Sequence, residues 1–221
     1  MSFSSPFLLE VYDLSLTDVA GAGKTFLTSK VIDHVRKVSD SSPNEGLAFF
    51  YCDRNEEDRR QPLSVLRSYI RQLSSAADNH YRVRKRLRSL YQEMRRGSHL
   101  GFDTCRELLL ESINLFPKTT LVLDALDECE PRSRDQLVKE LTFLLSNAKN
   151  PLKVFISSRP DRDIRRQFLG KPNIEIQANH NDRDIQRFVD EAIVKHGNWE
   201  GMSLSLKGDI VKVLLRRSEG M

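Results

Sequence analysis

Short apolar runs alternate along this chain with longer segments of helical period, and this alternation constrains the fold more than any other feature. A brief run rich in β-branched and aromatic residues is typical of a buried strand, whereas apolar residues that recur every three or four positions indicate a helix. No hairpin turn joins neighbouring strands, so the connections are expected to cross over through helices. The sequence therefore predicts an α/β fold with a mainly parallel sheet and helices on both faces.

The expected elements can be placed by residue range. Strands are expected at 47–52, 120–123, 152–156 and 173–176, and helices at 26–38, from Pro62 onward, and at 136–145, 184–196 and 204–217. Residues 10–17 alternate between polar and apolar, which is typical of a half-exposed strand and not of the centre of a parallel sheet.

Composition limits the class of protein. Hydrophobic residues make up 39% and charged residues 30% of the 221 residues, and 35 Lys and Arg nearly balance 31 Asp and Glu, which favours a soluble globular domain. No apolar stretch approaches the ~18 residues of a membrane span, so no membrane partner is expected. Three cysteines without paired spacing predict neither a disulfide framework nor a zinc site, and we expect a reducing, cytoplasmic location.

A glycine-rich segment leads directly into the first expected helix. Glycines in this position let backbone N–H groups close around phosphate oxygens at a helix N-terminus. Lys24 would then reach the β and γ phosphates, and the Thr25 hydroxyl would bind Mg²⁺. The alternative for so short a motif is an ordinary capped helix start. The residues expected to bind nucleotide are Gly21, Ala22, Gly23, Lys24, Thr25 and Phe26.

An acidic group follows the strand 120–123. Asp124 at the end of a buried strand could hold Mg²⁺, and either Asp127 or Glu128 could activate the attacking water, because spacing alone does not separate them. The alternative is an acidic loop that caps the following helix.

Arg159 follows two serines at the end of the strand 152–156. Ligands of open α/β sheets bind beyond the carboxyl ends of strands, so Arg159 could sense or stabilise a γ-phosphate there. An arginine before Pro160 is also an ordinary strand exit.

These motifs together resemble the NACHT branch of the STAND P-loop NTPases. The residues that carry the resemblance are Gly21 to Thr25, the segment 121–128 with Ala125 after the metal-binding acid, and Ser157 to Pro160; segment 49–52 and the helix from Pro62 are similar to fungal NACHT proteins of the nephrocystin-like N-terminal type. The resemblance covers residues 20–221. It implies a three-layer P-loop NTPase sandwich with a five-stranded sheet in the order 5-1-4-3-2, and it makes Arg159 the sensor arginine after the fourth strand.

The same resemblance implies a function. Members of the branch bind magnesium ATP, or GTP, as a conformational switch with slow hydrolysis, in fungal non-self recognition or cell-death signalling, and longer forms self-associate. The implied divisions are a divergent N-terminal segment at 1–19, a NACHT core at 20–180, and the start of a truncated C-terminal helical region at 181–221.

Two other functions are consistent with the residues. Asp18 stands where the phosphate-loop pattern has a glycine, so the chain could be a degenerate interaction module that no longer binds nucleotide. Residues 81–96 are rich in arginine and could attract an anionic partner, but the apolar residues between them favour an amphipathic helix with a solvated basic face. The sequence therefore does not favour nucleic acid as a partner.

Overall fold

The computed structural model describes residues 11–15, 23–40, 45–75, 85, 101–159, 161–171, 187, 191 and 201–218. The strands are β1 (Val11–Ser15), β2 (Glu45–Tyr51), β3 (Lys118–Asp124) and β4 (Leu152–Ser158). The helices are α1 (Lys24–Asp40), α2 (Pro62–Ser75), α4 (Phe102–Ile113), α5 (Pro131–Asn147), α6 (Arg162–Gln167) and α8 (Leu204–Ser218), with short 3₁₀ turns η1 (Glu57–Arg60) and η2 (Leu126–Glu128).

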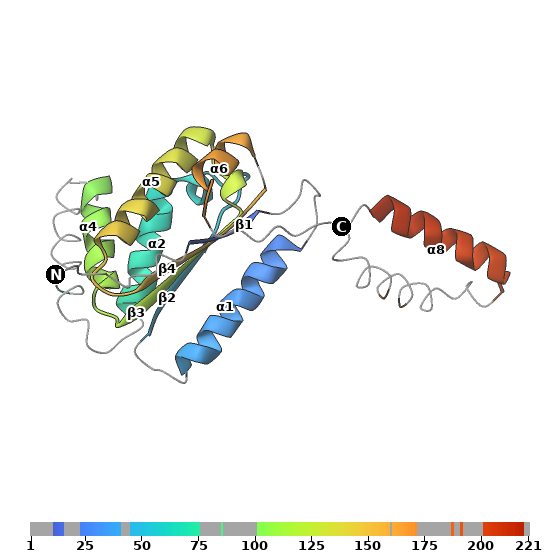
Figure 1. The fold of residues 1–221 in the computed structure, drawn as a ribbon, viewed down its shortest axis with the longest axis horizontal. Coiled ribbons are helices and arrows are strands. Elements are labelled where there is room, and N and C mark those ends of the chain that lie inside the picture. Colours follow the sequence, from blue (N-terminus) through green and yellow to red (C-terminus); the bar gives the residue numbers. More distant parts are fainter. Residues whose placement is uncertain are drawn as a thin grey trace.

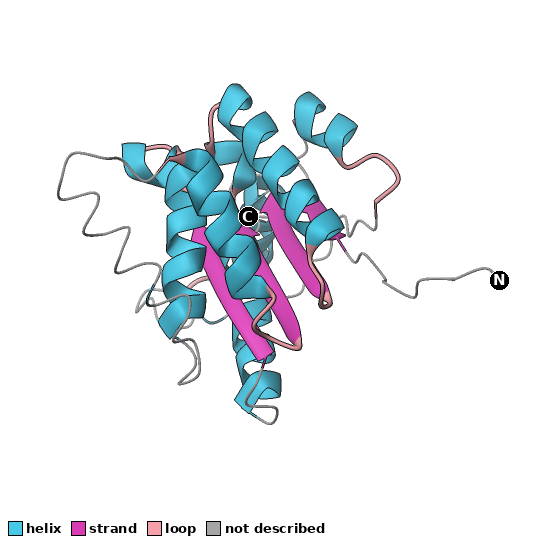
Figure 2. Ribbon diagram, turned by 90° about the vertical axis from the view of Figure 1, so that its left-hand side faces the viewer, coloured by secondary structure: helices cyan, strands magenta, loops and turns pink. Residues whose placement is uncertain are grey.

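The described strands form one parallel sheet in the order β1-β4-β3-β2. Helix α1 covers one face, while α2, α4 and α5 cover the other, so the core has three layers (Figures 1 and 2). The predicted α/β class with a parallel sheet is thus confirmed. The order agrees with the expected one as far as the described strands reach, but the strand expected at 173–176 lies outside the described residues, and the five-stranded order stays a prediction.

Alternate residues of the two central strands face opposite layers, which is why these strands are apolar along their whole length. Leu121 and Leu123 of β3 pack into the larger core with α2, α4 and α5. Val122 and Phe155 point to the other face and pack against Ile32 of α1. Both helical layers are therefore anchored on β3 and β4, the strands that end at the site described below.

Helix α4 was not expected from the sequence. Cys105, Leu108, Leu109 and Ile113 are all fully buried, and their spacing is that of one helical face. The signal was therefore present, although polar residues interrupt it. The helix expected at 184–196 and the basic segment 81–96 lie outside the described residues except for 187, 191 and 85.

The N-terminal strand forms where the alternating residues 10–17 predicted one. Residues Val11–Ser15 pair in parallel with Val154–Ser158 of β4. The divisions at 1–19, 20–180 and 181–221 stay predictions. Among the described residues, none of the helices has both the length and the apolar character needed to cross a membrane.

Gly46 in β2 should not tolerate a side chain. A Cβ there would lie 2.9 Å from the Phe116 ring and from Thr119 Oγ1. We expect Gly46→Ala to lower the free energy of unfolding by about 1–3 kcal/mol, because overpacking forces neighbours from their rotamers. Chemical unfolding measures this. Gly208→Ala in α8, where a Cβ would meet nothing within 4 Å, is the control, and an equal loss in both variants would contradict the steric explanation.

Candidate functional site

The site lies where the N-terminus of α1 meets the carboxyl ends of β3 and β4 (Figure 1). Parallel strands bring their carboxyl ends to one edge of the sheet, so residues distant in sequence meet there. Asp124 is the last residue of β3, and Thr25 lies in the first turn of α1. The two side chains are 99 residues apart in the chain and share a hydrogen bond.

Three hydroxyl groups surround the carboxylate of Asp124, which is 2% exposed. Thr25 Oγ1 donates to Oδ2 at 2.7 Å. Thr28 and Ser157 donate their hydroxyl hydrogens to Oδ1. Residues 25 and 28 share one face of α1 because they are three positions apart. These hydrogen bonds orient a buried carboxylate, and the oxygen atoms of Asp124 and Thr25 are the kind of ligand that Mg²⁺ prefers.

Lys24 is half-buried beside this carboxylate. Burial lowers the pKa of its ammonium group, and the positive charge of Arg159 lowers it as well. The carboxylates of Asp127, Asp124 and Glu128 act in the opposite direction. Lys24 therefore lies close enough to both Asp124 and Arg159 to interact with them electrostatically.

Asp127 joins the acidic turn η2 to the end of β4. Its Oδ1 accepts a hydrogen bond from the Arg159 backbone N–H at 2.9 Å. Its Oδ2 lies 3.5 Å from Arg159 Nε and 3.9 Å from Arg54 Nη2. The Asp127 side chain is 3% exposed, so it is a buried partner of Arg159.

Glu128 is more accessible than Asp127, with a side chain 24% exposed. It lines a cavity of about 560 Å³ at the edge of the sheet, together with Thr25, Asp124 and residues that follow β2. Its Oε2 accepts a hydrogen bond from the Arg54 backbone N–H at 3.0 Å, and its Oε1 lies 3.6 Å from the Arg54 guanidinium. The two acids that spacing could not separate thus have different surroundings.

Ala125 connects β3 to η2 in a left-handed conformation, with φ of 56°. Such a conformation costs a residue with a Cβ roughly 1–2 kcal/mol. Its backbone N–H donates to Ser157 Oγ at 3.0 Å, which ties the reversal to β4. The tight turn places Asp127 and Glu128 next to Asp124.

Arg134 of α5 was not expected at the site. The guanidinium is buried and donates to two carbonyl oxygens of the acidic turn, that of Asp127 at 2.6 Å and that of Cys129 at 2.7 Å. It also pairs with Asp161 at 2.7 Å and Asp163 at 3.1 Å, which follow Arg159 within four residues. The Arg134 side chain thus holds two loops together, the acidic turn η2 and the segment that follows Arg159.

Four of the expected nucleotide-binding residues contribute less to this picture. Gly21 and Ala22 lie outside the described residues. Gly23 is described, with a positive φ of 77°, and its carbonyl accepts the first hydrogen bond of α1 from Leu27. Phe26 is 68% exposed, and its ring lies 5.2 Å from Lys30 Nζ.

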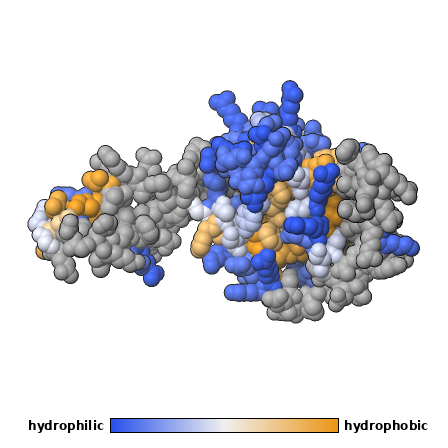
Figure 3. All heavy atoms as spheres, turned by 180° about the vertical axis from the view of Figure 1, so that it is seen from behind, coloured by the Kyte–Doolittle hydropathy of each residue, from blue (hydrophilic) through white to orange (hydrophobic). Residues whose placement is uncertain are grey.

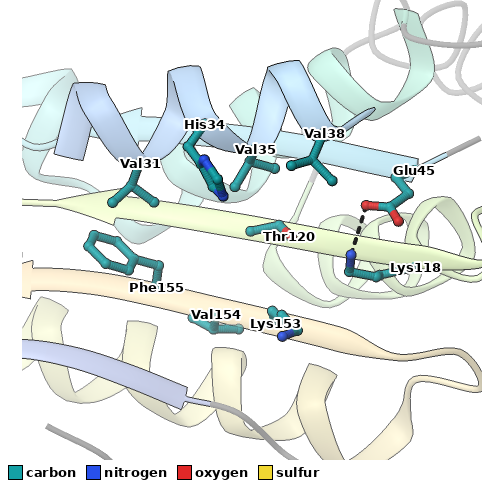
Figure 4. Close-up of a pocket in the computed structure, with 10 residues that line it drawn as sticks. All are labelled: Val31, His34, Val35, Val38, Glu45, Lys118, Thr120, Lys153, Val154 and Phe155. Carbon is teal, nitrogen blue, oxygen red and sulfur yellow. Dashed lines mark hydrogen bonds and ion pairs between the residues drawn. The ribbon is translucent and has the colours of Figure 1, made fainter. Parts of the chain in front are cut away.

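A second cavity, of about 240 Å³, lies between α1 and the sheet (Figure 4). Val31, Val35 and Phe155 line it, and an ion pair of 2.9 Å between Lys118 and Glu45 stands at one end. That ion pair marks the amino ends of β2 and β3, opposite to the candidate site. Apolar surface also gathers on α8, at the left of Figure 3, where Leu204 is 87% exposed.

Comparison with protein families gives one match. Residues 14–159, about two thirds of the chain, match the family described as Nephrocystin 3, N-terminal. A comparison with curated proteins gave no match.

Solved structures of low similarity were also found. The Aeropyrum pernix ORC2 protein in ADPNP and ADP complexes has a TM-score of 0.47 at 12% identity, over 81% of this chain and 45% of that one. The Aeropyrum pernix ORC1 protein in complex with DNA has a TM-score of 0.44 at 18% identity, over 83% and 44%. A structure described as a DNA replication initiation factor has a TM-score of 0.44 at 13% identity, over 96% and 53%. The chain thus spans about half the length of these proteins.

Proposed function

Because the chain belongs to the nephrocystin 3 N-terminal family, we propose that it is the nucleotide-binding core of a NACHT-type P-loop NTPase. It binds ATP, or alternatively GTP, with Mg²⁺ at the edge where α1 meets β3 and β4. The observation that supports this most strongly is the hydrogen bond of 2.7 Å from Thr25 to the buried Asp124, because the two residues expected to bind Mg²⁺ already lie together.

The residues present fit a magnesium nucleotide. Asp124 and Thr25 supply oxygen ligands, and the cavity of about 560 Å³ opens beside both. Arg159 Nε faces Asp127 Oδ2 at 3.5 Å, an ion pair that lacks hydrogen-bond geometry. The guanidinium also carries terminal N–H groups, and a phosphate oxygen is an acceptor that suits them.

Each residue has a distinct role in this proposal. The backbone N–H groups of Gly21, Ala22, Gly23 and the residues up to Phe26 surround the phosphates at the start of α1. Lys24 contacts the β and γ phosphates, Thr25 and Asp124 hold Mg²⁺, and Arg159 senses the γ-phosphate. When bound, Mg²⁺ would offset negative charge on the phosphate oxygens.

Glu128 is better suited than Asp127 to orient or deprotonate water. It lines the cavity, whereas Asp127 is buried against Arg159. Asp127 is therefore a positioning residue that holds Arg159 at the end of β4. The assignment requires Glu128 to exchange its contacts with Arg54 for contacts with water when nucleotide is bound.

Hydrolysis measurements test this assignment. We expect Glu128→Gln to bind magnesium ATP as the parent does and to lower single-turnover hydrolysis at least about 100-fold, the usual range for a lost general base. Asp127→Asn should instead weaken the preference for ATP over ADP, because Arg159 loses its partner. Glu128→Gln with parental hydrolysis would contradict the role of Glu128, and loss of hydrolysis only in Asp127→Asn would reverse the two assignments.

The biological setting belongs to the same proposal. The nucleotide acts as a conformational switch in cytoplasmic signalling of fungal non-self recognition or cell death, with self-association in a longer form. Asp18 lies outside the described residues, and a degenerate module without nucleotide binding is the alternative outcome. A parent that does not bind ATP, together with an Asp18→Gly variant that does, would select that alternative.

A further inference from the structure

Two thiols from separate parts of the chain lie in contact beside the candidate site. Cys52 directly follows β2 and Cys129 directly follows η2, and the two are 77 residues apart. Their Sγ atoms are 3.5 Å apart and share a hydrogen bond. Both residues are buried and carry free thiols. No function described above uses them.

The backbone holds both residues at the rim of the site. The Cys52 N–H donates to the carbonyl of Asp124 at 3.0 Å, and the Cys129 N–H donates to that of Leu126 at 3.2 Å. Cys52 lines the cavity of about 560 Å³, so the thiol pair stands at the wall of that cavity. Arg134 holds the Cys129 carbonyl at 2.7 Å and keeps the second thiol in place.

We propose that Cys52 and Cys129 form a reversible regulatory disulfide when a peroxide enters the cavity. Disulfide formation requires the sulfurs to approach from 3.5 Å to about 2.05 Å. The third cysteine, Cys105, is buried in α4, on a different element from either of the paired thiols.

The chemistry balances with one peroxide per disulfide. One of the two sulfurs attacks one peroxide oxygen, the O–O bond breaks, and the released oxygen leaves as water, giving a sulfenic acid. The other sulfur then attacks the oxidised sulfur, the S–S bond forms, and a second water leaves. Two thiols are oxidised by two electrons in total, and hydrogen peroxide is reduced to two waters. A dithiol reductant reverses the step by exchange.

The surroundings of the two thiols differ, and those of Cys129 favour the thiolate. Its hydrogen bond with Cys52 lowers the pKa of Cys129, and the positive charge of Arg134 lowers it further, while burial acts in the opposite direction. The same hydrogen bond and burial raise the pKa of Cys52.

The consequence for nucleotide binding rests on the proposed function. Closing the sulfurs from 3.5 Å draws η2, with Asp127 and Glu128, toward the end of β2. Since Ala125 alone separates Asp124 from this turn, movement of the turn would shift Asp124 away from Thr25, the other proposed ligand of Mg²⁺. Oxidation is expected to weaken magnesium ATP binding at least about fivefold, the lower end of ordinary coupling between two sites.

The test needs no nucleotide in its first arm. The full chain is treated with hydrogen peroxide, its remaining thiols are alkylated, and intact mass and peptide mapping follow. We expect an intramolecular Cys52–Cys129 disulfide, reversed by dithiothreitol, in the parent and in the Cys105→Ser control. A disulfide to Cys105, oxidation of single thiols without a disulfide, or no reaction would overturn the proposal. Mapping the parent decides this without a substitution at either thiol of the pair.

The second arm compares magnesium ATP affinity before and after oxidation. Unchanged affinity in a protein that does form the disulfide would overturn the regulatory role. If neither form binds ATP while the disulfide forms, the proposed function has failed and the disulfide site stands.

Discussion

Lys24→Ala is expected to weaken magnesium ATP binding at least about 100-fold, since removing one partner of a desolvated charge pair costs 2–5 kcal/mol or more. Lys24 stands at the start of α1, half-buried, among Asp124, Asp127, Glu128 and Arg159. In the proposed complex it is the cation between the β and γ phosphates. Equilibrium titration with ATP measures the effect.

Lys30→Ala is the matched control for this prediction. Lys30 lies on the same helix with an exposed side chain over the Phe26 ring, and its loss should change the affinity by less than about twofold. Equal ATP affinity of the Lys24→Ala variant and the parent would contradict the proposed phosphate-binding role of Lys24. The lowered pKa of Lys24 adds a pH dependence: the charged form binds phosphate, so affinity should fall as the pH rises through that pKa.

Arg134→Ala is expected to lower the free energy of unfolding by about 3 kcal/mol, the lower end of the range for breaking a buried ion pair. The buried guanidinium satisfies the carbonyls of Asp127 and Cys129, which would be left without their donor. Its acidic partners Asp161 and Asp163 are partly exposed, so water weakens these two ion pairs. Losing them should therefore add little to the loss of stability. Urea unfolding measures the difference.

Arg132→Ala provides the comparison on the same helix. Arg132 is exposed in the first turn of α5, and its removal should alter the stability by no more than about 0.5 kcal/mol. Equal losses in the two variants would show that Arg134 does not hold the acidic turn. A small loss in both variants would mean that the acidic turn and the segment after Arg159 are stable without Arg134.

The sequence allowed the three strands β2, β3 and β4 to be located to within a few residues. They are covered by helices on both faces, so each is a continuous apolar run that stands out from its surroundings. The approach of Thr25 to Asp124 followed from the same reasoning, because both lie at the carboxyl edge of a parallel sheet. Both results follow from the topology of the sheet. That topology can be inferred from the sequence patterns of whole strands and helices.

The finer features of the site depend on single residues whose role no local pattern marks. Thr28 and Arg134 occupy ordinary positions in helices, and only the packed structure places them on Asp124 and on the acidic turn. The left-handed Ala125 was not foreseeable, since alanine has no preference for that conformation. The different environments of Asp127 and Glu128 depend on the turn that Ala125 creates.

Titration of the purified chain with a fluorescent ATP analogue, in Mg²⁺ and again in EDTA, tests the central claim most directly. The account predicts saturable binding to one site that weakens at least about tenfold without the metal, because Thr25 and Asp124 would hold the nucleotide through Mg²⁺. Absence of saturable binding in Mg²⁺, or equal affinity with and without it, would contradict the account.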